Sequence, residues 1–508
     1  MPHSLASYKS NATWSKPTSS ATPSSPLLSS PLLPSRVQVA SHQFAATTPN
    51  VVTTTKVPRV AEKQAIGAPG DADGEGSKRQ PERQPEAAAA ADTSGAVPTE
   101  ESPKTDDRGA TPPGAADKVV CNTEGPVSET CELDGDVRTN GSARSVTLVP
   151  AGPSSERQEW KVRPYSRRTM AGVDRVTVTR LASPAADDAS SAPAPCAVTH
   201  DAPAVLFALG GLTGNYWHDF SDVLVPLFAA SRRYGGDVLF LVANAQPWWL
   251  AKYEAVLRRL SRYDAVDLDR DSRVRCFRRL AVGLRLHKEL SLVPGLASGS
   301  DGRPLSMADF TAFLRDTYAL PRAAPVRLSQ SPSPDRRPRL LLIHRPHYRR
   351  IVNVDEVRRA AEEAGFEVTV ASPRADAAVA ETARMVNAHD ALLGVHGAGL
   401  TNAVFLPAGG VVIQVVPYGR LERMARADFG EPVADMGLRY LEYSVAAEES
   451  TLLEMLGPEH PVIKDPEAVH RAGWDKVAEY YLGKQDVRVD VKRFAPTLAQ
   501  AIDHLRQQ

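Results

Sequence analysis

The sequence has no long apolar run. None of its stretches approaches about 18 consecutive apolar residues, so none is predicted to form a transmembrane helix. The longest apolar piece near the N-terminus, residues 26–34, is interrupted by serine and proline and is not typical of a signal peptide. Net charge is also absent, because 60 Lys and Arg balance 60 Asp and Glu, and no overall field attracts nucleic acid or an anionic membrane. These absences favour a soluble protein.

Cysteine is scarce, with four residues in a chain of 508. Cys121 and Cys131 bracket a Gly-Pro segment that could turn the chain back. They could form a disulfide, which suits an oxidising compartment, or they could be two buried thiols. Cys196 and Cys276 could form a second pair, although no local feature argues for it.

Large apolar residues are sparse in the first part of the chain. Residues 1–118 consist largely of Ser, Thr, Pro, Ala and isolated charges, which cannot offset the entropy of ordering the chain, so we expect a disordered low-complexity region. From Val119 apolar runs recur, and the remaining roughly 390 residues suffice for two domains. We expect an N-terminal α/β domain over 119–320, a Pro- and Ser-rich linker over 321–338 and a C-terminal Rossmann-like domain over 339–508.

Strand-like and helix-like segments alternate in both expected domains. In the first, the predicted strands are 204–210, 237–245 and 274–284, and the predicted helices are 217–234, 247–263 and 306–318. In the second, the predicted strands are 339–344, 367–372, 391–396 and 410–416, and the predicted helices are 354–365, 378–389 and 400–405. This alternation predicts an α/β fold with two Rossmann-like domains facing each other across a cleft. Ligands of such sheets bind at the carboxyl ends of the strands.

One strand-to-helix loop, Gly394–Asn402, has the composition of a phosphate-binding segment. Gly397 and Gly399 remove side chains where backbone N–H groups could approach a phosphate. The helix beginning near Leu400 would direct its positive end at the same place. His396, at the strand terminus, could hydrogen-bond a diphosphate oxygen. The loop is typical of a nucleotide-diphosphate site, although an ordinary tight turn would also explain it.

Basic residues follow the predicted strand 339–344. Arg345 stands at its carboxyl end, where a guanidinium can pair with a diphosphate and stabilise charge on a departing nucleotide. Arg350 and Asn353 follow in the same loop, whereas Arg349 is better explained as a solvated loop residue. We therefore expect Arg345, Arg350 and Asn353 to contribute to the diphosphate site.

His218 and Asp222 lie four residues apart at the start of the predicted helix 217–234. That spacing places both side chains on one face of a helix. A histidine with a carboxylate partner can act as a general base. The alternative is that the acidic residues here only favour a helix N-terminus.

Two Asp-x-Asp triplets, Asp134–Asp136 and Asp267–Asp269, match a short metal-binding pattern. Such triplets arise easily by chance, and the first lies beside a predicted turn far upstream of both domains' strand–helix loops. We expect no metal site at either one.

Five segments occur in an order that is specific to one family: Cys131–Arg138, Gly210–Asp222, Leu341–Glu356, Gly394–Asn402 and Asp486–Phe494. With these segments the chain resembles glycosyltransferase family 61, in particular the plant branch that decorates xylan. The resemblance extends from about residue 120 to the C-terminus, with the catalytic core at about 203–417.

The resemblance implies an inverting transferase with a GT-B fold, in a type II membrane protein of the Golgi. Plant members use UDP-activated pentoses, chiefly UDP-arabinofuranose or UDP-xylose, with xylan as acceptor; the family also includes an N-glycan xylosyltransferase. The UDP-sugar is a substrate, and we expect no cofactor and no divalent metal. The N-terminal domain would take the acceptor, with His218 or Asp222 as base. The C-terminal domain would bind the donor through Arg345, Arg350, Asn353, His396, Gly397, Ala398, Gly399 and Asn402.

The chain departs from the family in two features. No membrane anchor is visible in this sequence, and Trp217 stands where members commonly carry Phe or a similar aromatic. Two glycosylation sequons, at Asn11 and Asn140, are compatible with a secretory location. A non-catalytic nucleotide- or glycan-binding relative is the alternative from another class. A dinucleotide-dependent oxidoreductase is disfavoured, because Gly394–Asn402 lies late in its domain and not at the first strand–helix turn.

Overall fold

A computed structural model describes residues 117–152, 156–182, 193–326, 336–374 and 376–508. Almost all of the region 1–118 predicted to be disordered, and half of the predicted linker, lie outside these ranges. The first strand already begins at Lys118. Within the described ranges, no helix is both long enough and apolar enough to cross a bilayer.

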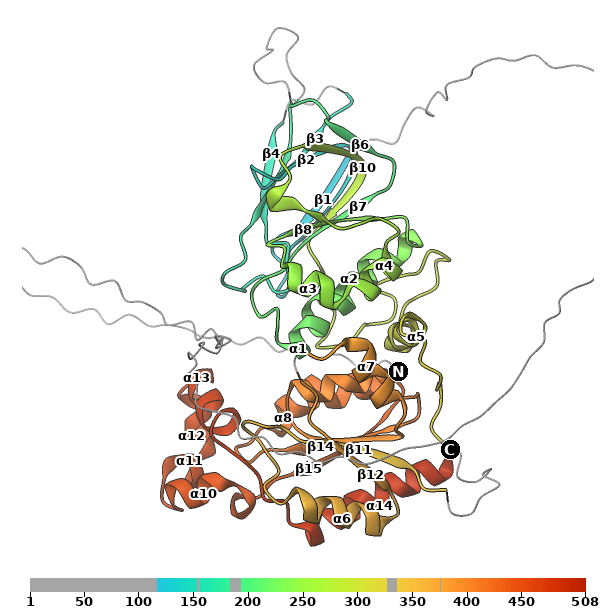
Figure 1. The fold of residues 1–508 in the computed structure, drawn as a ribbon. Coiled ribbons are helices and arrows are strands. Elements are labelled where there is room, and N and C mark those ends of the chain that lie inside the picture. The colour runs from blue at the N-terminus through green and yellow to red at the C-terminus, as the bar shows by residue number, and fades with distance from the viewer. Residues whose placement is uncertain (1–116, 153–155, 183–192, 327–335, 375) are drawn as a thin grey trace, which may run out of the picture. The chain divides into compact units, whose positions relative to one another are not determined.

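Ten strands of the described residues form one mixed sheet (Figure 1). The central order is β4-β5-β3-β2-β10-β7-β8-β9, with β1 beside β2 and β6 beside β10. The strands are β1 (Lys118–Asn122), β2 (Thr130–Asn140), β3 (Ser145–Val149), β4 (Gln158–Val162), β5 (Val176–Arg180), β6 (Val198–His200), β7 (Ala204–Ala208), β8 (Leu239–Ala243), β9 (Val266–Asp267) and β10 (Val274–Val282).

The alternating pattern predicts a parallel sheet, but only part of this sheet is parallel. β10, β7, β8 and β9 run parallel to one another, and β7 and β8 are wholly buried. β2 instead pairs antiparallel with β1, β3 and β10. The expectation of a wholly Rossmann-like first domain is therefore wrong for β1–β5. In β2 and β3 buried residues alternate with less buried ones, and such strands contain no continuous apolar run to predict them.

The second sheet is wholly parallel within the described residues, with the order β12-β11-β13-β14-β15. Its strands are β11 (Arg339–Ile343), β12 (Glu367–Ala371), β13 (Ala391–Val395), β14 (Val411–Val416) and β15 (Arg439–Ser444). Helices α6 (Val354–Ala364) and α14 (Val491–Gln507) cover one face, and α7 (Val379–Asn387) lies on the other (Figure 1). Leu340 and Leu342 belong to the core under α6 and α14, while Leu341 and Ile343 belong to the core under α7. The predicted parallel sheet is confirmed here, with β15 as an added edge strand.

The predicted helix 217–234 forms, but it is not uniform. It consists of α1 (Tyr216–His218), a π-helical turn (Asp219–Leu224), α2 (Val225–Ser231) and a 3₁₀ turn (Arg232–Tyr234). Such π-helical turns often mark functional sites. The other helices of the first block are α3 (Pro247–Lys252), α4 (Glu254–Leu260) and α5 (Met307–Thr317), the last starting with a capping box at Ser306.

A 3₁₀ turn, η4 (Leu268–Arg270), completes the first block. The remaining helical elements of the second block are the 3₁₀ helix η6 (Ala398–Phe405), α8 (Glu422–Ala425), a π-helical turn (Arg426–Gly430), α9 (Glu431–Asp435), a 3₁₀ turn (Ala447–Glu449), α10 (Thr451–Leu456), α11 (Pro461–Lys464), α12 (Pro466–Arg471), α13 (Trp474–Val477) and a π-helical turn (Ala478–Leu482). η6 stands where the sequence predicts the short helix 400–405.

Aromatic residues join the two blocks. Phe220 packs edge to face on Phe310 and on Phe405, with ring centroids 6.3 Å and 6.1 Å away. All three residues belong to one hydrophobic cluster that also contains Leu341 and Leu392 of the second sheet. The helix that carries His218 and the helix η6 are therefore held together by a shared core.

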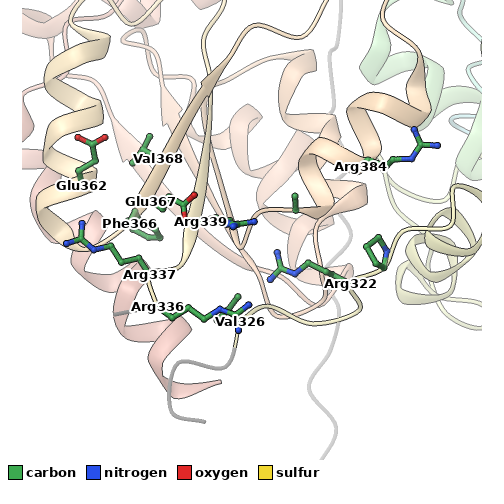
Figure 2. A pocket seen from close by; sticks show the side chains of 12 residues that line it. Arg322, Val326, Arg336, Arg337, Arg339, Glu362, Phe366, Glu367, Val368 and Arg384 are labelled. Carbon is green, nitrogen blue, oxygen red and sulfur yellow. Dashed lines mark hydrogen bonds and ion pairs between the residues drawn. The ribbon is translucent and has the colours of Figure 1, made fainter. Parts of the chain in front are cut away.

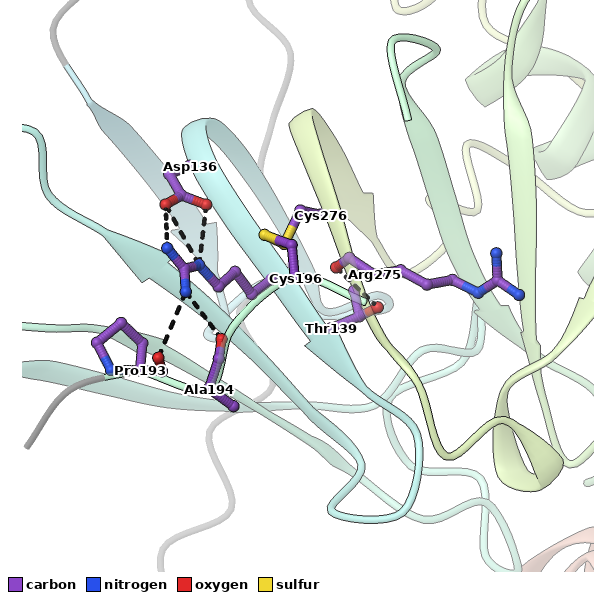
Figure 3. Close-up of a disulfide and its surroundings, with 8 residues drawn as sticks. Asp136, Thr139, Pro193, Ala194, Cys196, Arg275 and Cys276 are labelled. Atoms are coloured by element: carbon purple, nitrogen blue, oxygen red, sulfur yellow. Dashed lines mark hydrogen bonds and ion pairs between the residues drawn. A yellow bond between two sulfur atoms is a disulfide. The ribbon is translucent and has the colours of Figure 1, made fainter. Parts of the chain in front are cut away.

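All four cysteines are paired. Cys121 and Cys131 face each other across β1 and β2 and form one disulfide, and Cys196 and Cys276 form the other (Figure 3). The pairing that the sequence leaves open is thus resolved in favour of disulfides, which are typical of proteins from oxidising compartments.

The disulfide Cys196–Cys276 should contribute more stability than the other. Replacing both of these cysteines by Ser should lower the free energy of unfolding by about 2–5 kcal/mol, because the bond closes a segment of 80 residues. The same replacement at Cys121 and Cys131, which are separated by 10 residues, should cost about 2 kcal/mol less. Denaturant unfolding without reductant measures both variants, and a larger loss at Cys121 and Cys131 would contradict the prediction.

Candidate active site

His218 and Asp222 form a hydrogen-bonded pair at the start of the long helix of the first block. His218 Nδ1 lies 2.9 Å from Asp222 Oδ2. The Asp222 side chain is fully buried, whereas the His218 side chain keeps 17% of its surface exposed. The pair therefore has one buried end and one end that a ligand can reach.

Three further donors converge on the Asp222 carboxylate. Tyr165 donates its hydroxyl to Oδ2 at 2.8 Å. Arg167 donates from Nε to Oδ2 at 2.9 Å and from Nη2 to Oδ1 at 2.8 Å. The same guanidinium donates to both carboxylate oxygens of Glu289, at 2.9 Å and 2.6 Å. Burial opposes ionisation of Asp222, but hydrogen bonds from His218 and Arg167 outweigh it and lower the pKa of this carboxyl group.

This environment separates the roles of the two residues. An ionised carboxylate only accepts hydrogen bonds, so the Nδ1 atom of His218 carries the proton that lies between them. Nε2 is then the basic nitrogen of the ring. Asp222 is buried and saturated by donors, which suits it to orient the imidazole and not to take a proton itself.

The loop Gly394–Asn402 leads from β13 into η6, and two arginines lie against its centre. A Cβ atom on Gly397 would lie 2.8 Å from Arg345 Nη1 and 2.9 Å from Arg349 Nη1. The φ angle of Gly397 is +141°, which side-chain-bearing residues rarely adopt. Arg349 also donates from Nη1 to the carbonyl of His396 at 2.8 Å. Glycine is favoured here by its positive φ angle, and a side chain would in addition displace the two guanidinium groups.

These two guanidinium groups form an uncompensated positive cluster. Burial lowers the pKa of Arg345; burial and the charge of Arg345 lower the pKa of Arg349 to about 9. No carboxylate among the described residues pairs with either arginine, and within that set Arg349 Nε is buried without a hydrogen-bond partner. An anion bound between them would relieve both the repulsion and the unsatisfied donor.

His396 is buried beside this cluster and is neutral. Burial, followed by the charges of Arg349 and Arg345, lowers its pKa to about 3. Its Nδ1 lies 2.7 Å from the Gln414 side-chain amide, and its Nε2 lies 3.9 Å from Asp428 Oδ2. The backbone carbonyl of His396 accepts the hydrogen bond from Arg349 and so helps to position that guanidinium group.

The other predicted donor-binding residues divide into two groups. Ala398 and Gly399 begin η6 at the arginine cluster, although Gly399 itself packs on Ile343, with its virtual Cβ 3.2 Å from Ile343 Cγ2. Asn402 is buried within η6 and donates from Nδ2 to the carbonyl of Gly399 at 3.0 Å.

Arg350 and Asn353 are instead tied to the C-terminal segment. Arg350 pairs with Asp486 through Nε and Nη2, at 2.9 Å and 2.6 Å. Asn353 exchanges hydrogen bonds with the backbone of Val489, at 2.9 Å and 3.0 Å. The structure thus places Arg349, which the sequence favours as a solvated residue, where Arg350 and Asn353 are expected.

The two halves of the site adjoin each other. α1, which carries His218, packs beside η6. Trp217 donates its indole N–H to the carbonyl of Asp428 at 3.3 Å, and Arg167 lies over the Trp217 ring at 5.7 Å. Trp217 therefore contributes a hydrogen bond between the two blocks.

Asp428 is a site residue that no sequence pattern indicates. It lies in the π-helical turn Arg426–Gly430, near both His396 and the His218 pair. Burial, together with the nearby Glu289 carboxylate, raises its pKa to about 6, while His218 and Arg167 act in the opposite direction. Perturbed carboxylates of this kind cluster at functional sites.

Asp428 should make stability depend on pH. Its pKa is higher in the folded state than the ordinary value of 3.8, so the folded protein binds the proton more tightly. The stability that this proton contributes is present below pH 4 and is lost as pH rises towards 6. Between pH 4 and pH 7 the wild type should therefore lose unfolding free energy through this group. In Asp428→Asn that loss should be smaller by about 1–3 kcal/mol.

Denaturant titrations at the two pH values measure this difference. Asp264→Asn removes the same charge from a side chain that is 90% exposed and provides the control. An identical pH dependence in Asp428→Asn and in the wild type would contradict the prediction.

Carboxylates of both Asp-x-Asp triplets form ion pairs with arginines. Asp136 accepts from Arg138 at 2.6 Å (Figure 3), and Asp134 pairs with Arg279 at 2.5 Å. Asp136 also approaches the sulfurs of Cys196 and Cys276, but these are joined in a disulfide and are not thiolate ligands. Asp269 lies 3.0 Å from Arg144.

A cavity of about 750 Å³ lies at the amino-terminal ends of strands of the second sheet, opposite the end that carries the loop Gly394–Asn402 (Figure 2). Arg339 and Glu367, the first residues of β11 and β12, line it, whereas Gly394–Asn402 follows the end of β13. Arg322 in its wall pairs with Asp390. This cavity is therefore not part of the candidate site.

Comparison with known proteins places these residues in a family context. A family model described as Glycosyltransferase 61 matches residues 216–413, which include His218, Asp222, Arg345 and Gly397. The β-1,2-xylosyltransferase XYXT1 of Oryza sativa subsp. japonica is 44% identical over 405 residues, covering 76% of this chain and 84% of that protein. The α-1,3-arabinosyltransferase XAT3 of the same organism is 39% identical, covering 76% and 66%. The xylan glycosyltransferase MUCI21 of Arabidopsis thaliana is 33% identical, covering 79% and 81%.

Proposed function

The chain belongs to glycosyltransferase family 61, and we propose that it transfers a pentose, arabinofuranose or xylose, from a UDP-sugar to xylan. The relatives are named for xylosyl, arabinosyl and xylan transfer, which supports this class of donor and acceptor. The observation that carries the proposal is the partly buried pair Arg345 and Arg349 at Gly397, which no carboxylate of the described residues neutralises, beside the helix of His218 and Asp222.

The donor would bind the second block. Its diphosphate would lie between Arg345 and Arg349, at the N-terminal end of η6, where backbone N–H groups also favour an anion. The two guanidinium groups would stabilise the charge that develops on UDP as the bond from the anomeric carbon to the phosphate oxygen breaks. Because arginines supply this positive charge, we expect no requirement for a divalent metal. Activity that persists in excess EDTA would support this expectation.

The acceptor would approach from the first block. Nε2 of His218 would take the proton of a xylan hydroxyl while that oxygen forms the new bond to the anomeric carbon, on the face opposite UDP. The configuration would therefore be inverted. Asp222 would hold the ring and stabilise the imidazolium formed, which later releases the proton to water. In this scheme residues 119–320 form the acceptor side and 339–508 the donor side of a GT-B arrangement in a Golgi enzyme.

One screen tests the proposal. Purified protein is incubated with UDP-xylose or UDP-arabinofuranose and xylo-oligosaccharides, and released UDP and the glycosylated product are measured. We expect product with one UDP-pentose and with the anomeric configuration opposite to that of the donor. UDP binding without transfer to xylo-oligosaccharides or N-glycans would indicate a non-catalytic binding protein. Transfer to N-glycans alone would identify the acceptor as a glycoprotein.

A further inference from the structure

A second cavity, of about 360 Å³, lies at the carboxyl ends of β7, β8 and β9. Its wall includes Gly210 after β7, Asn244 and Gln246 after β8, and Asp267 and Asp269 at the end of β9. In the parallel part of an α/β sheet this edge is where ligands bind. The loop that begins at Gly210 continues directly into α1 and His218.

The polar groups of this cavity suit hydroxyl groups better than a cation. Arg144 pairs with both Asp174 and Asp269, and Asp267 pairs with Arg270 at 3.5 Å. These carboxylates therefore already have cationic partners. Among the described residues, Asp267 Oδ1 is buried without a hydrogen-bond donor, so it is an acceptor available to a ligand hydroxyl.

Trp248 provides an exposed aromatic surface next to the same loop. Its side chain is 49% exposed, whereas that of the neighbouring Trp249 is fully buried. A Cβ atom on Gly214 would lie 3.3 Å from Trp248 Cη2, and Gly214 has a φ angle of +107°. The loop Gly210–Asn215 therefore lies against the indole edge. The same loop thus contacts a large exposed aromatic ring at Gly214 and lines the polar cavity at Gly210, a combination that suits a ligand surface.

One buried carboxylate fixes this arrangement relative to His218. Asp219 accepts hydrogen bonds from the Gly214 backbone N–H at 2.8 Å, from Trp249 Nε1 at 2.9 Å and from the Tyr253 hydroxyl at 2.8 Å. It thereby joins the loop, the helix α3 that carries Trp248, and the residue after His218. The aromatic surface and His218 are parts of one rigid frame.

We propose that the acceptor polysaccharide binds at this edge, with one sugar ring stacked on Trp248 and the hydroxyl groups of a neighbouring ring in the cavity at Asn244 and Asp267. The proposal rests on the transferase function and names the surface that takes its acceptor. The ligand is a chain of neutral pyranose rings, because it must offer both an apolar ring face and hydroxyl donors. The frame built on Asp219 then directs a hydroxyl of the same chain towards His218.

Affinity electrophoresis in gels that contain xylan tests this surface. Trp248→Ala should weaken xylan binding about 10- to 100-fold and raise the KM for xylo-oligosaccharides, while the dissociation constant of UDP stays unchanged. Trp474→Ala is the matched control, because this tryptophan is 60% exposed but lies on α13. Asp267→Ala tests the cavity independently of the ring and should weaken xylan binding as well.

The outcomes separate this proposal from the proposed function. If the wild type transfers pentose to xylan and Trp248→Ala binds xylan as the wild type does, the surface is wrong and the function stands. If the wild type neither binds nor modifies xylan, the xylan acceptor is wrong, and the same variants are compared on other neutral polysaccharides. Binding that depends on Trp248 there would retain the surface, and its absence would overturn it.

Discussion

Replacement of Arg349 by Ala should weaken UDP binding about 10- to 100-fold without unfolding the protein. Arg349 is partly buried beside Arg345, and the two charges oppose each other in the absence of an anion. Removing one of them takes away a charge-assisted donor to the diphosphate but also relieves that repulsion. The thermal midpoint without ligand should therefore be similar or higher, while its increase on adding UDP should be largely lost.

Arg350→Ala is the matched control for this prediction. It removes the next arginine in the chain, whose guanidinium is half exposed and bound to Asp486. We expect UDP affinity close to that of the wild type, measured for both variants by calorimetry or by the UDP-dependent thermal shift. A large loss of affinity in Arg350→Ala, together with normal affinity in Arg349→Ala, would place the donor site elsewhere.

The difference between these neighbours shows what the sequence cannot provide. Tyr348 and Arg349 have φ angles of +46° and +54°, so two successive residues adopt the left-handed conformation. The chain turns sharply there and sends Arg349 back to the carbonyl of His396, while Arg350 meets Asp486. Nothing in the letters Arg-Arg indicates such a turn, since neither glycine nor asparagine occupies it.

The fold was more accessible from the sequence than the site. The apolar run Leu340–Ile343 and the run Val411–Val416, which only Gln414 interrupts, predict strands buried on both faces, and the structure has them as β11 and β14. The site, by contrast, depends on long-range partners. His218 and Asp222 are linked by helical spacing, but Arg167 is 55 residues from Asp222 and 122 from Glu289. Charges that meet only through the folded sheet carry no local pattern.

The His218 pair carries the second large expected effect. His218→Ala should lower turnover by about 100- to 10,000-fold, because the acceptor hydroxyl loses the group that removes its proton. UDP affinity should not change, since Arg345 and Arg349 lie in the second block. Added imidazole should restore part of the activity by occupying the space of the lost ring. Turnover equal to that of the wild type would remove His218 from the mechanism and leave Asp428, with its raised pKa, as the base to test.

Asp222→Asn distinguishes a positioning carboxylate from a base. The amide keeps the size of Asp222 but removes the charge that fixes the proton on Nδ1 of His218, so turnover should fall while UDP still binds. Arg167 also loses a partner, and the free energy of unfolding should fall as well, which denaturant titration measures. His218→Ala leaves Arg167 and its two carboxylates intact and should be the more stable variant. We expect both variants to lose activity and only Asp222→Asn to lose stability. This is the result expected when His218 takes the proton and Asp222 holds the imidazole of His218 in place.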